Sequence, residues 1–232
     1  MREQKITLAE HLEELRGRIF KSVIAVIIAS CAIYSFVGVI YGSMIKPVGK
    51  LHFIAPQEAF IANIKIAFFA GILLASPVVL YQLWRFIAAA LTEKEKKSAL
   101  IFGILSFVFF IAGASFGYFV ITPIGIKFLM GFASNMVIPM ITVSKYISFV
   151  GMLTMAFGAV FQLPLASLFL TKLGIVTPKL LSDKRKHAIV AMFVGAAVLT
   201  PPDVVTQCLM AVPLLILYEI GIVFSKIVYR PI

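Results

Sequence analysis

Three carboxylates near the N-terminus have the spacing that a cation-binding surface needs. Glu10, Glu13 and Glu14 share one face of a helix. Thr7, with Glu10 three residues later, forms a capping-box pattern that predicts the start of this helix. At spacings of three and four residues, like charges on a helix repel each other by about 0.2–0.5 kcal/mol per pair. A cationic ligand bound to this face would relieve that repulsion.

The same helix also carries its own positive charge. Basic residues follow the glutamates closely enough to neutralise them locally, as on most solvated helix faces: Arg16, Arg18 and Lys21. A second face is apolar, because leucines recur at helical spacing: Leu8, Leu12 and Leu15. The pattern therefore predicts an amphipathic helix within residues 1–18, whose acidic face either binds a cation or is neutralised from within.

The composition places this helix at a membrane. The 232 residues are 61% hydrophobic and only 13% charged, and the mean hydropathy is +1.05. A soluble domain has about 45–50% apolar and about 25% charged residues. Nothing near the N-terminus resembles a cleaved signal peptide. We expect one polytopic membrane domain, residues 1–232, with its membrane core in residues 19–226.

The net charge and the cysteines do not indicate a nucleic-acid-binding protein, a disulfide-rich protein or a zinc protein. The net charge of +11 does not indicate nucleic-acid binding, because basic residues in membrane proteins mark cytoplasmic loops and contacts with anionic lipid. Cys31 and Cys208 both lie in apolar segments, which indicates neither a disulfide framework nor a zinc site.

Apolar segments of suitable length predict six membrane-spanning helices. They cover about residues 19–41, 60–90, 99–121, 146–173, 187–199 and 204–225. Pro77 is expected to interrupt the second segment, and Pro201 and Pro202 to force a tight turn between the last two. The fifth segment has about a dozen residues, or roughly 18 Å of helix, against a hydrocarbon core of about 30 Å. It must thin the bilayer locally or be sheltered by neighbouring helices.

The distribution of Lys and Arg predicts the orientation. Sixteen of the 21 basic residues fall on one side of these spans. The remaining five fall on the other side: Lys46, Lys50, Lys65, Lys127 and Lys145. Because cytoplasmic loops carry the excess of Lys and Arg, both termini are expected in the cytoplasm.

The ten carboxylates can be sorted in the same way. Seven are predicted to be cytoplasmic: Glu3, Glu10, Glu13, Glu14, Glu93, Glu95 and Asp183. Glu58 and Asp203 are placed on the outer side, and Glu219 near the inner end of the last span. The N-terminal helix and residues 91–97 (LTEKEKK) are thus acidic clusters in a basic protein, which suits a cationic ligand. Alternatively, the two glutamates of residues 91–97 pair with neighbouring lysines at a helix start, where the helix dipole also favours them.

Enzymatic chemistry finds no support in the other motifs. Residues 113–117 (GASFG) match the nucleophile-elbow pattern but lie in the middle of a predicted helix, where a small-residue packing surface is the favoured interpretation. His11 is not followed by a second histidine four residues later, as a zinc motif requires. We expect no cofactor and no metal.

Gln162 is the polar residue of most interest inside a predicted span. Its amide needs hydrogen-bond partners in hydrocarbon and is a functional candidate for that reason. Alternatively, it forms an interhelical hydrogen bond or satisfies backbone that Pro164 leaves without a partner. Glu219 either contacts a partner or extends to the inner interface.

Four motifs in order along the chain resemble one family. They are residues 11–16 (HLEELR), 76–87 (SPVVLYQLWRFI), 157–164 (FGAVFQLP) and 199–203 (LTPPD). Together they resemble motifs of TatC, the signal-recognition core of the twin-arginine protein translocase. The resemblance covers nearly the whole chain. It implies six helices in a concave, glove-like arrangement, with the fifth and sixth short and both termini cytoplasmic.

The resemblance also implies a function and its residues. TatC-like proteins bind twin-arginine signal peptides of folded cargo at the cytoplasmic face and assemble with TatA- and TatB-type single-span subunits. Transport is driven by the proton-motive force across a bacterial inner or plasma membrane, or its archaeal or thylakoid counterpart. By resemblance, the signal-peptide site takes in eight residues: Glu10, Glu13, Glu14, Leu15, Arg16, Phe86, Glu93 and Glu95. A homo-oligomer within a larger complex is also implied.

Further family positions are matched outside this site. Asp203 corresponds to the acid after the double proline, and Pro47 to the proline of the first outer loop. Where the family usually has glutamate, this chain has Gln162. A hydrogen-bonding role at that position is retained, but not an ionised one. The alternative function is a small-solute secondary transporter. That function predicts ionisable groups near the midplane, where this chain offers essentially Gln162 alone.

Overall fold

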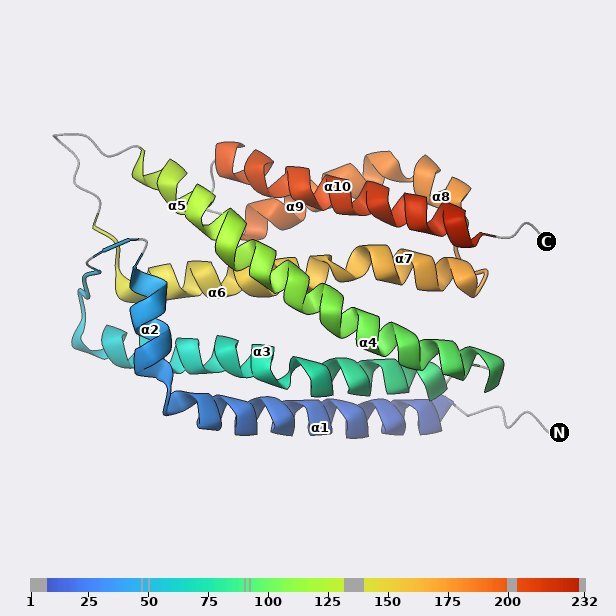
Figure 1. Ribbon diagram of the computed structural model, residues 1–232, viewed down its shortest axis with the longest axis horizontal. Coiled ribbons are helices and arrows are strands. Elements are labelled where there is room, and N and C mark those ends of the chain that lie inside the picture. The colour runs from blue at the N-terminus through green and yellow to red at the C-terminus, as the bar shows by residue number, and fades with distance from the viewer. Residues whose placement is uncertain are drawn as a thin grey trace. The chain divides into compact units, whose positions relative to one another are not determined.

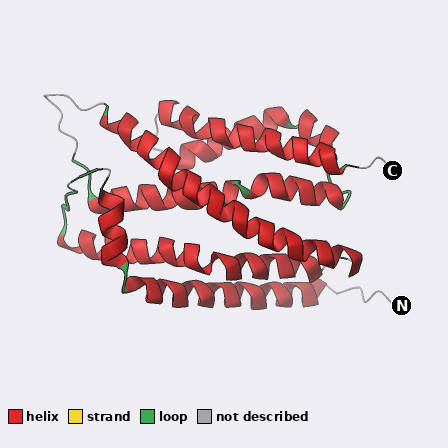
Figure 2. Ribbon diagram, viewed as in Figure 1, coloured by secondary structure: helices red, strands yellow, loops and turns green. Residues whose placement is uncertain are grey.

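The structure is a computed structural model that describes residues 8–46, 48–49, 51–89, 91, 93–131, 140–199 and 204–229. The side chains of residues 8, 93–100, 199, 205, 206 and 209 lie outside this description. The described residues form helices joined by loops and turns, with one isolated bridge between His52 and Thr142 (Figure 2).

The helices follow one another along the whole chain (Figure 1). They are α1 (Leu8–Tyr34), α2 (Val37–Ile45), α3 (Pro56–Ala89), α4 (Glu93–Phe116), the π-helical turn η1 (Gly117–Ile121), α5 (Thr122–Met130), α6 (Val143–Val160), α7 (Gln162–Lys172), α8 (Pro178–Asp183), α9 (Arg185–Leu199) and α10 (Val204–Val228).

Five helical stretches among the described residues are long and apolar enough to cross a membrane. They are Ala9–Tyr34, Pro56–Ala89, Ile101–Met130, Val143–Lys172 and Met210–Val228. The predicted fifth span is α9, which has 15 residues and measures about 22 Å. The chain is thus an all-helical polytopic membrane protein, as predicted. Pro77 lies inside α3 without ending it, so the expected interruption there was wrong.

The chain forms two compact units. Unit 1 comprises residues 1–43 and 63–108, and unit 2 comprises residues 44–62 and 109–232. The single domain expected from the composition stays a prediction, as does the glove-like arrangement. Each unit has its own packing, described separately below.

In unit 1, α1 and α3 approach each other closely. A Cβ atom on Gly71 of α3 would lie 2.7 Å from the Cα atom of Ser30 in α1, so only glycine allows this approach. Further along α3, Trp84 is buried and stacks on Phe102 of α4, with 5.6 Å between the ring centroids. These contacts fix α3 between its two neighbours in this unit.

In unit 2, the predicted small-residue surface of residues 113–117 is confirmed. A Cβ atom on Gly113 would lie 2.5 Å from the carbonyl oxygen of Phe157, and one on Gly117 would lie 3.0 Å from that of Leu153. The same region of α6 contributes Leu153 and Phe157 to a buried cluster with Ile121, Ala196, Met210 and Ala211. The glycines therefore let α4 and η1 reach the core of this unit.

Hydroxyl groups connect α7 to α10 in the same unit. Ser167 Oγ donates to the carbonyl oxygen of Gly221 at 3.1 Å, and the hydroxyls of Thr171 and Ser225 are 2.6 Å apart. Interhelical hydrogen bonds of this kind hold membrane helices together, each contributing about 0.6 kcal/mol. They fix how far α7 and α10 can slide along each other.

The close contact at Gly113 predicts that alanine substitutions at two glycines of α4 have different effects on stability. Gly113→Ala should destabilise the protein by about 1–3 kcal/mol, because the new methyl group must push α6 away. Gly103→Ala in the same helix is the matched control. Its Cβ would meet Trp84 at an ordinary 3.7 Å, so the substitution should be neutral, or stabilising by up to about 1 kcal/mol. Thermal unfolding in detergent measures both, and equal effects would contradict the packing argument.

The short α9 predicts that the start of α10 lies below the bilayer surface. Val204 is 73% exposed and Met140, in the loop before α6, is 71% exposed. Single cysteines are placed at these two positions in a chain with Cys31 and Cys208 replaced by serine, and labelled with an impermeant thiol reagent from the predicted outer side. Labelling at position 204 should accelerate as the lipid acyl chains are shortened, because the core then matches the helix. Position 140 should not respond. Equal labelling rates at every bilayer thickness would rule the idea out.

Candidate functional site

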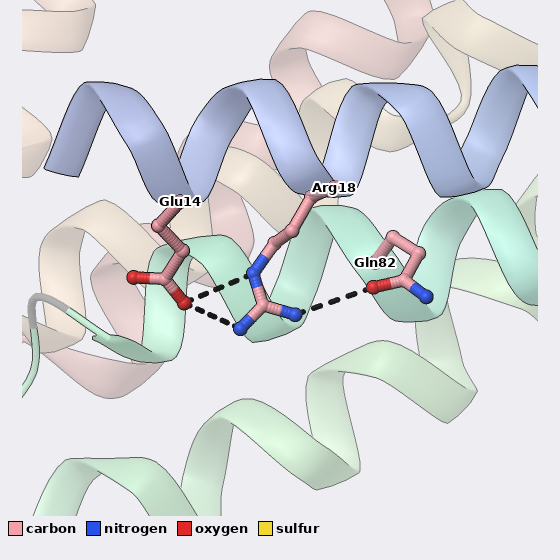
Figure 3. A network of polar contacts seen from close by, with 3 residues as sticks. All are labelled: Glu14, Arg18 and Gln82. Atoms are coloured by element: carbon pink, nitrogen blue, oxygen red, sulfur yellow. Dashed lines mark hydrogen bonds and ion pairs between the residues drawn. The ribbon is translucent and has the colours of Figure 1, made fainter. Parts of the chain in front are cut away.

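The candidate site begins with an ion pair on α1. Glu14 Oε1 accepts hydrogen bonds from both Nε, at 3.0 Å, and Nη2 of Arg18 (Figure 3). The third guanidinium nitrogen, Nη1, donates to Oε1 of Gln82 on α3 at 3.2 Å. The Arg18 side chain is 14% exposed and that of Glu14 is 27% exposed. The network therefore ties the start of α1 to the second half of α3.

The polar face of α1 turns toward α3. One turn before Glu14, His11 stacks on Phe86, with 4.4 Å between the ring centroids and 21° between the planes. His11, Glu14 and Arg18 follow the helical spacing of three and four residues. Gln82 and Phe86 are four residues apart on the facing side of α3. The hydrogen bond from Arg18 to Gln82 and the stack of His11 on Phe86 thus hold the polar face of α1 against α3.

The apolar stripe of α1 points in a different direction. Leu12 is 65% exposed. An open groove along this helix is lined by Leu12, Leu15, Arg16, Ile19, Phe20 and Val23. In a bilayer an exposed apolar face meets lipid, whereas a polar contact needs a partner inside the protein. This explains why the polar face of α1, and not its leucines, forms the contact with α3.

The other residues of the predicted acidic cluster on α1 are more accessible. Glu10, Glu13 and Arg16 are exposed, and Leu15 is half-buried. Glu14 is half-buried and ion-paired with Arg18.

The start of α4 lies near the same end of α3. The stack of Trp84 on Phe102 aligns α4 with α3, and only residues 90–92 connect the two helices. Glu93 and Glu95 lie in the first turn of α4, about 10–14 Å along the helix from Phe102. Their side chains are outside the described part. The backbone therefore brings the two acidic segments to the same end of unit 1.

The intramembrane polar candidates lie in unit 2. Gln162 is half-buried at the start of α7, and its Nε2 donates to the carbonyl oxygen of Gly158 at 3.5 Å. The carbonyl that Pro164 leaves without a helical donor is that of Val160, so the alternatives that the sequence left open stay open. Glu219 forms a two-point ion pair with Arg185 of α9, with Nε–Oε1 and Nη2–Oε2 both at 2.8 Å. Glu219 thus contacts a partner within the chain.

Several predicted residues have a purely structural place or lie outside the described residues. Pro164 is buried inside α7 and Pro77 lies inside α3. Four positions are outside the described residues: Pro47, Pro201, Pro202 and Asp203. Among the described residues, no group of three or more His, Cys, Asp or Glu side chains could hold a metal ion.

The sequence did not predict that Gln82 and His11 take part in the contact between α1 and α3. The spacing of four residues between Glu14 and Arg18 favours an ion pair, and local neutralisation of Glu14 by Arg18 was one of the two alternatives. Gln82 and the stacking of His11 on Phe86 left no such pattern, because both depend on which turns of α1 and α3 face each other.

The comparisons with known proteins agree along nearly the whole chain. The family described as Sec-independent protein translocase protein (TatC) matches residues 10–213. The chain is 41% identical to the Sec-independent protein translocase protein TatC of Desulforapulum autotrophicum, over 97% of this chain and 86% of the relative. It is 42% identical to that of Carboxydothermus hydrogenoformans, over 98% and 96%.

A solved structure agrees with these relatives. The crystal structure of the twin arginine translocase receptor TatC is 41% identical to this chain and superimposes with a TM-score of 0.88. The alignment covers 95% of this chain and all of the solved one. The resemblance seen in four motifs is confirmed, and the chain belongs to the TatC family of Sec-independent protein translocase proteins.

Proposed function

We propose that this chain is the receptor of a twin-arginine protein translocase and binds Arg-Arg signal peptides of folded cargo at the end of unit 1 that carries Glu14. The observation that carries the proposal is the shielded Glu14 carboxylate, held between α1 and α3. Glu95 is the second carboxylate of the proposed site, since α4 begins at the same end of the unit. Two arginines presented in sequence could each meet one acid, with charge-assisted hydrogen bonds.

The other proposed contacts surround these two acids. Glu10, Glu13 and Arg16 are exposed next to Glu14 and would contact the peptide around its arginine pair. Phe86 packs on His11 and supports the α1–α3 edge. We assign no catalytic chemistry to the site.

The proposal includes the surroundings of the receptor. The chain sits in a bacterial-type inner or plasma membrane with both termini in the cytoplasm, since sixteen of 21 basic residues fall on that side of the spans. It works with TatA- and TatB-type single-span subunits in a larger complex that contains several copies of the chain. Transport is driven by the proton-motive force. None of the similar proteins named above is a solute transporter, so the alternative function is not pursued.

Gln162 is proposed to act through hydrogen bonding. Gln162→Glu should be tolerated, because a carboxyl group keeps an oxygen and a protonatable partner at the break between α6 and α7. Gln162→Leu should reduce transport or thermal stability further, because the carbonyl oxygen of Gly158 loses its donor. Transport of a reporter cargo and unfolding in detergent measure the two effects. A neutral Gln162→Leu in both assays would make the residue a bystander.

The acidic site predicts a loss of peptide affinity. Glu14→Gln or Glu95→Gln should each weaken binding of an Arg-Arg signal peptide about fivefold, which corresponds to about 1 kcal/mol for a partly exposed charge pair. The preference for Arg-Arg over Lys-Lys should narrow, because the planar fork of arginine loses its carboxylate partner. Binding should also weaken as salt rises. Titration of labelled peptides onto the full chain in detergent measures all three.

The matched control is Asp183→Asn. Asp183 is an exposed carboxylate at the end of α8 in unit 2, and its removal changes the net charge by the same amount. It should leave peptide affinity unchanged. Unaltered affinity and unaltered arginine preference in both glutamate variants would remove these residues from the site.

A further inference from the structure

Glu14 does not present a bare carboxylate to a ligand. Its Oε1 accepts two hydrogen bonds from Arg18, whose third nitrogen is held by Gln82. Arg18 is more buried than Glu14, with 14% against 27% of the side chain exposed. All three guanidinium nitrogens thus have a partner. Arg18 is therefore a fixed part of the site and not an exposed side chain that a ligand could displace.

The second carboxylate oxygen has different surroundings. Oε2 of Glu14 points away from the guanidinium of Arg18 (Figure 3) and accepts no hydrogen bond from the described residues. The negative charge of the carboxylate is already compensated by Arg18. A ligand that arrives at Oε2 therefore meets a directional hydrogen-bond acceptor whose own charge is balanced by Arg18.

Arginine and lysine respond differently to such an acceptor. The ammonium of lysine is a compact, strongly hydrated point charge and depends on the net field. The guanidinium of arginine is weakly hydrated, carries its donors in a planar fork and stacks on aromatic rings. One turn away, the stacked rings of His11 and Phe86 flank the site.

We propose that Arg18 sets the preference of the Glu14 site for arginine over lysine. By cancelling the charge of Glu14 and holding Oε1, it makes recognition depend on directed hydrogen bonds to Oε2, which a guanidinium forms better than an ammonium. Arg18 is a specificity-determining residue that acts through Glu14. This inference rests on the function proposed above.

Arg18→Gln tests the inference by removing the compensating charge. Arg-Arg and Lys-Lys versions of one signal peptide are titrated onto the full chain in detergent. The Lys-Lys peptide should bind about threefold more tightly or better, while the Arg-Arg peptide gains less, because the unmasked carboxylate now attracts any cation. The ratio of the two dissociation constants should narrow accordingly. The Lys-Lys affinity should also become more sensitive to salt than in the unmodified chain.

Gln82→Glu tests the same idea without removing Arg18. The new carboxylate shares the guanidinium from its other side, so Glu14 is less fully compensated and the preference should narrow in the same direction. This variant covers the case in which Arg18→Gln does not fold. Arg85→Gln is the matched control, since it removes an arginine from the exposed side of α3, where the guanidinium lies over Tyr81 at 5.8 Å. It should leave the preference unchanged.

The outcomes separate this inference from the proposed function. If Arg18→Gln and Gln82→Glu leave the arginine preference unchanged, or weaken both peptides equally, Arg18 is only a structural residue and the inference is overturned. If the unmodified chain binds neither peptide, or if Glu14→Gln leaves Arg-Arg binding unchanged, the proposed site itself fails and the inference fails with it.

Discussion

A membrane helix gains little by burying leucine or isoleucine against a neighbour, because lipid tails are as apolar as those side chains. Close approach of backbones must supply the attraction instead, and in this chain it occurs at glycines. Gly71 brings α3 against Ser30 of α1, and Gly113 brings α4 against Phe157 of α6. The α1–α3 contact also determines the side chains that meet further along these helices. Arg18 lies twelve residues before Ser30, and Gln82 lies eleven after Gly71, so one packed turn sets the register of the whole polar network.

Two ion pairs join charged groups of the described helices. The pair of Glu14 with Arg18 lies in the first part of α1, and the pair of Arg185 with Glu219 joins the start of α9 to α10. A charged side chain at the centre of a membrane helix costs about 2.5–3.5 kcal/mol, which disfavours such pairs deeper in the spans. Inside them, hydroxyls such as those of Ser76 and Thr154 bond to carbonyls of their own helix. These hydroxyls therefore need no partner from another helix.

Much of the fold follows from composition and local pattern. The sequence predicts the long apolar helices and the short fifth one because the length of an apolar segment is a local property. The ion pair of Glu14 with Arg18 was foreseeable because the two residues are four apart on a helix. The effect of Pro77 was misjudged because a proline inside a membrane helix is tolerated when neighbouring helices compensate for the lost hydrogen bond. Gln82 could not be assigned to the site, since its partner is 64 residues away in the chain. Local spacing thus predicts contacts within one helix, whereas contacts between helices depend on the register in which the helices pack.

The outward apolar face of α1 reverses the usual relation between accessibility and mutational tolerance. In a soluble protein the exposed positions accept almost any polar residue, because water surrounds them. On α1, Ile27 is 56% exposed and Ile28 is 64% exposed, yet both lie in a span where hydrocarbon is the solvent. A lysine or aspartate at either position would be unfavourable because its charge would lie in hydrocarbon, and not because of a neighbouring residue in the chain. Ser30, which faces Gly71, is limited by its size. Ile27 and Ile28 are therefore accessible and yet unfavourable for charge.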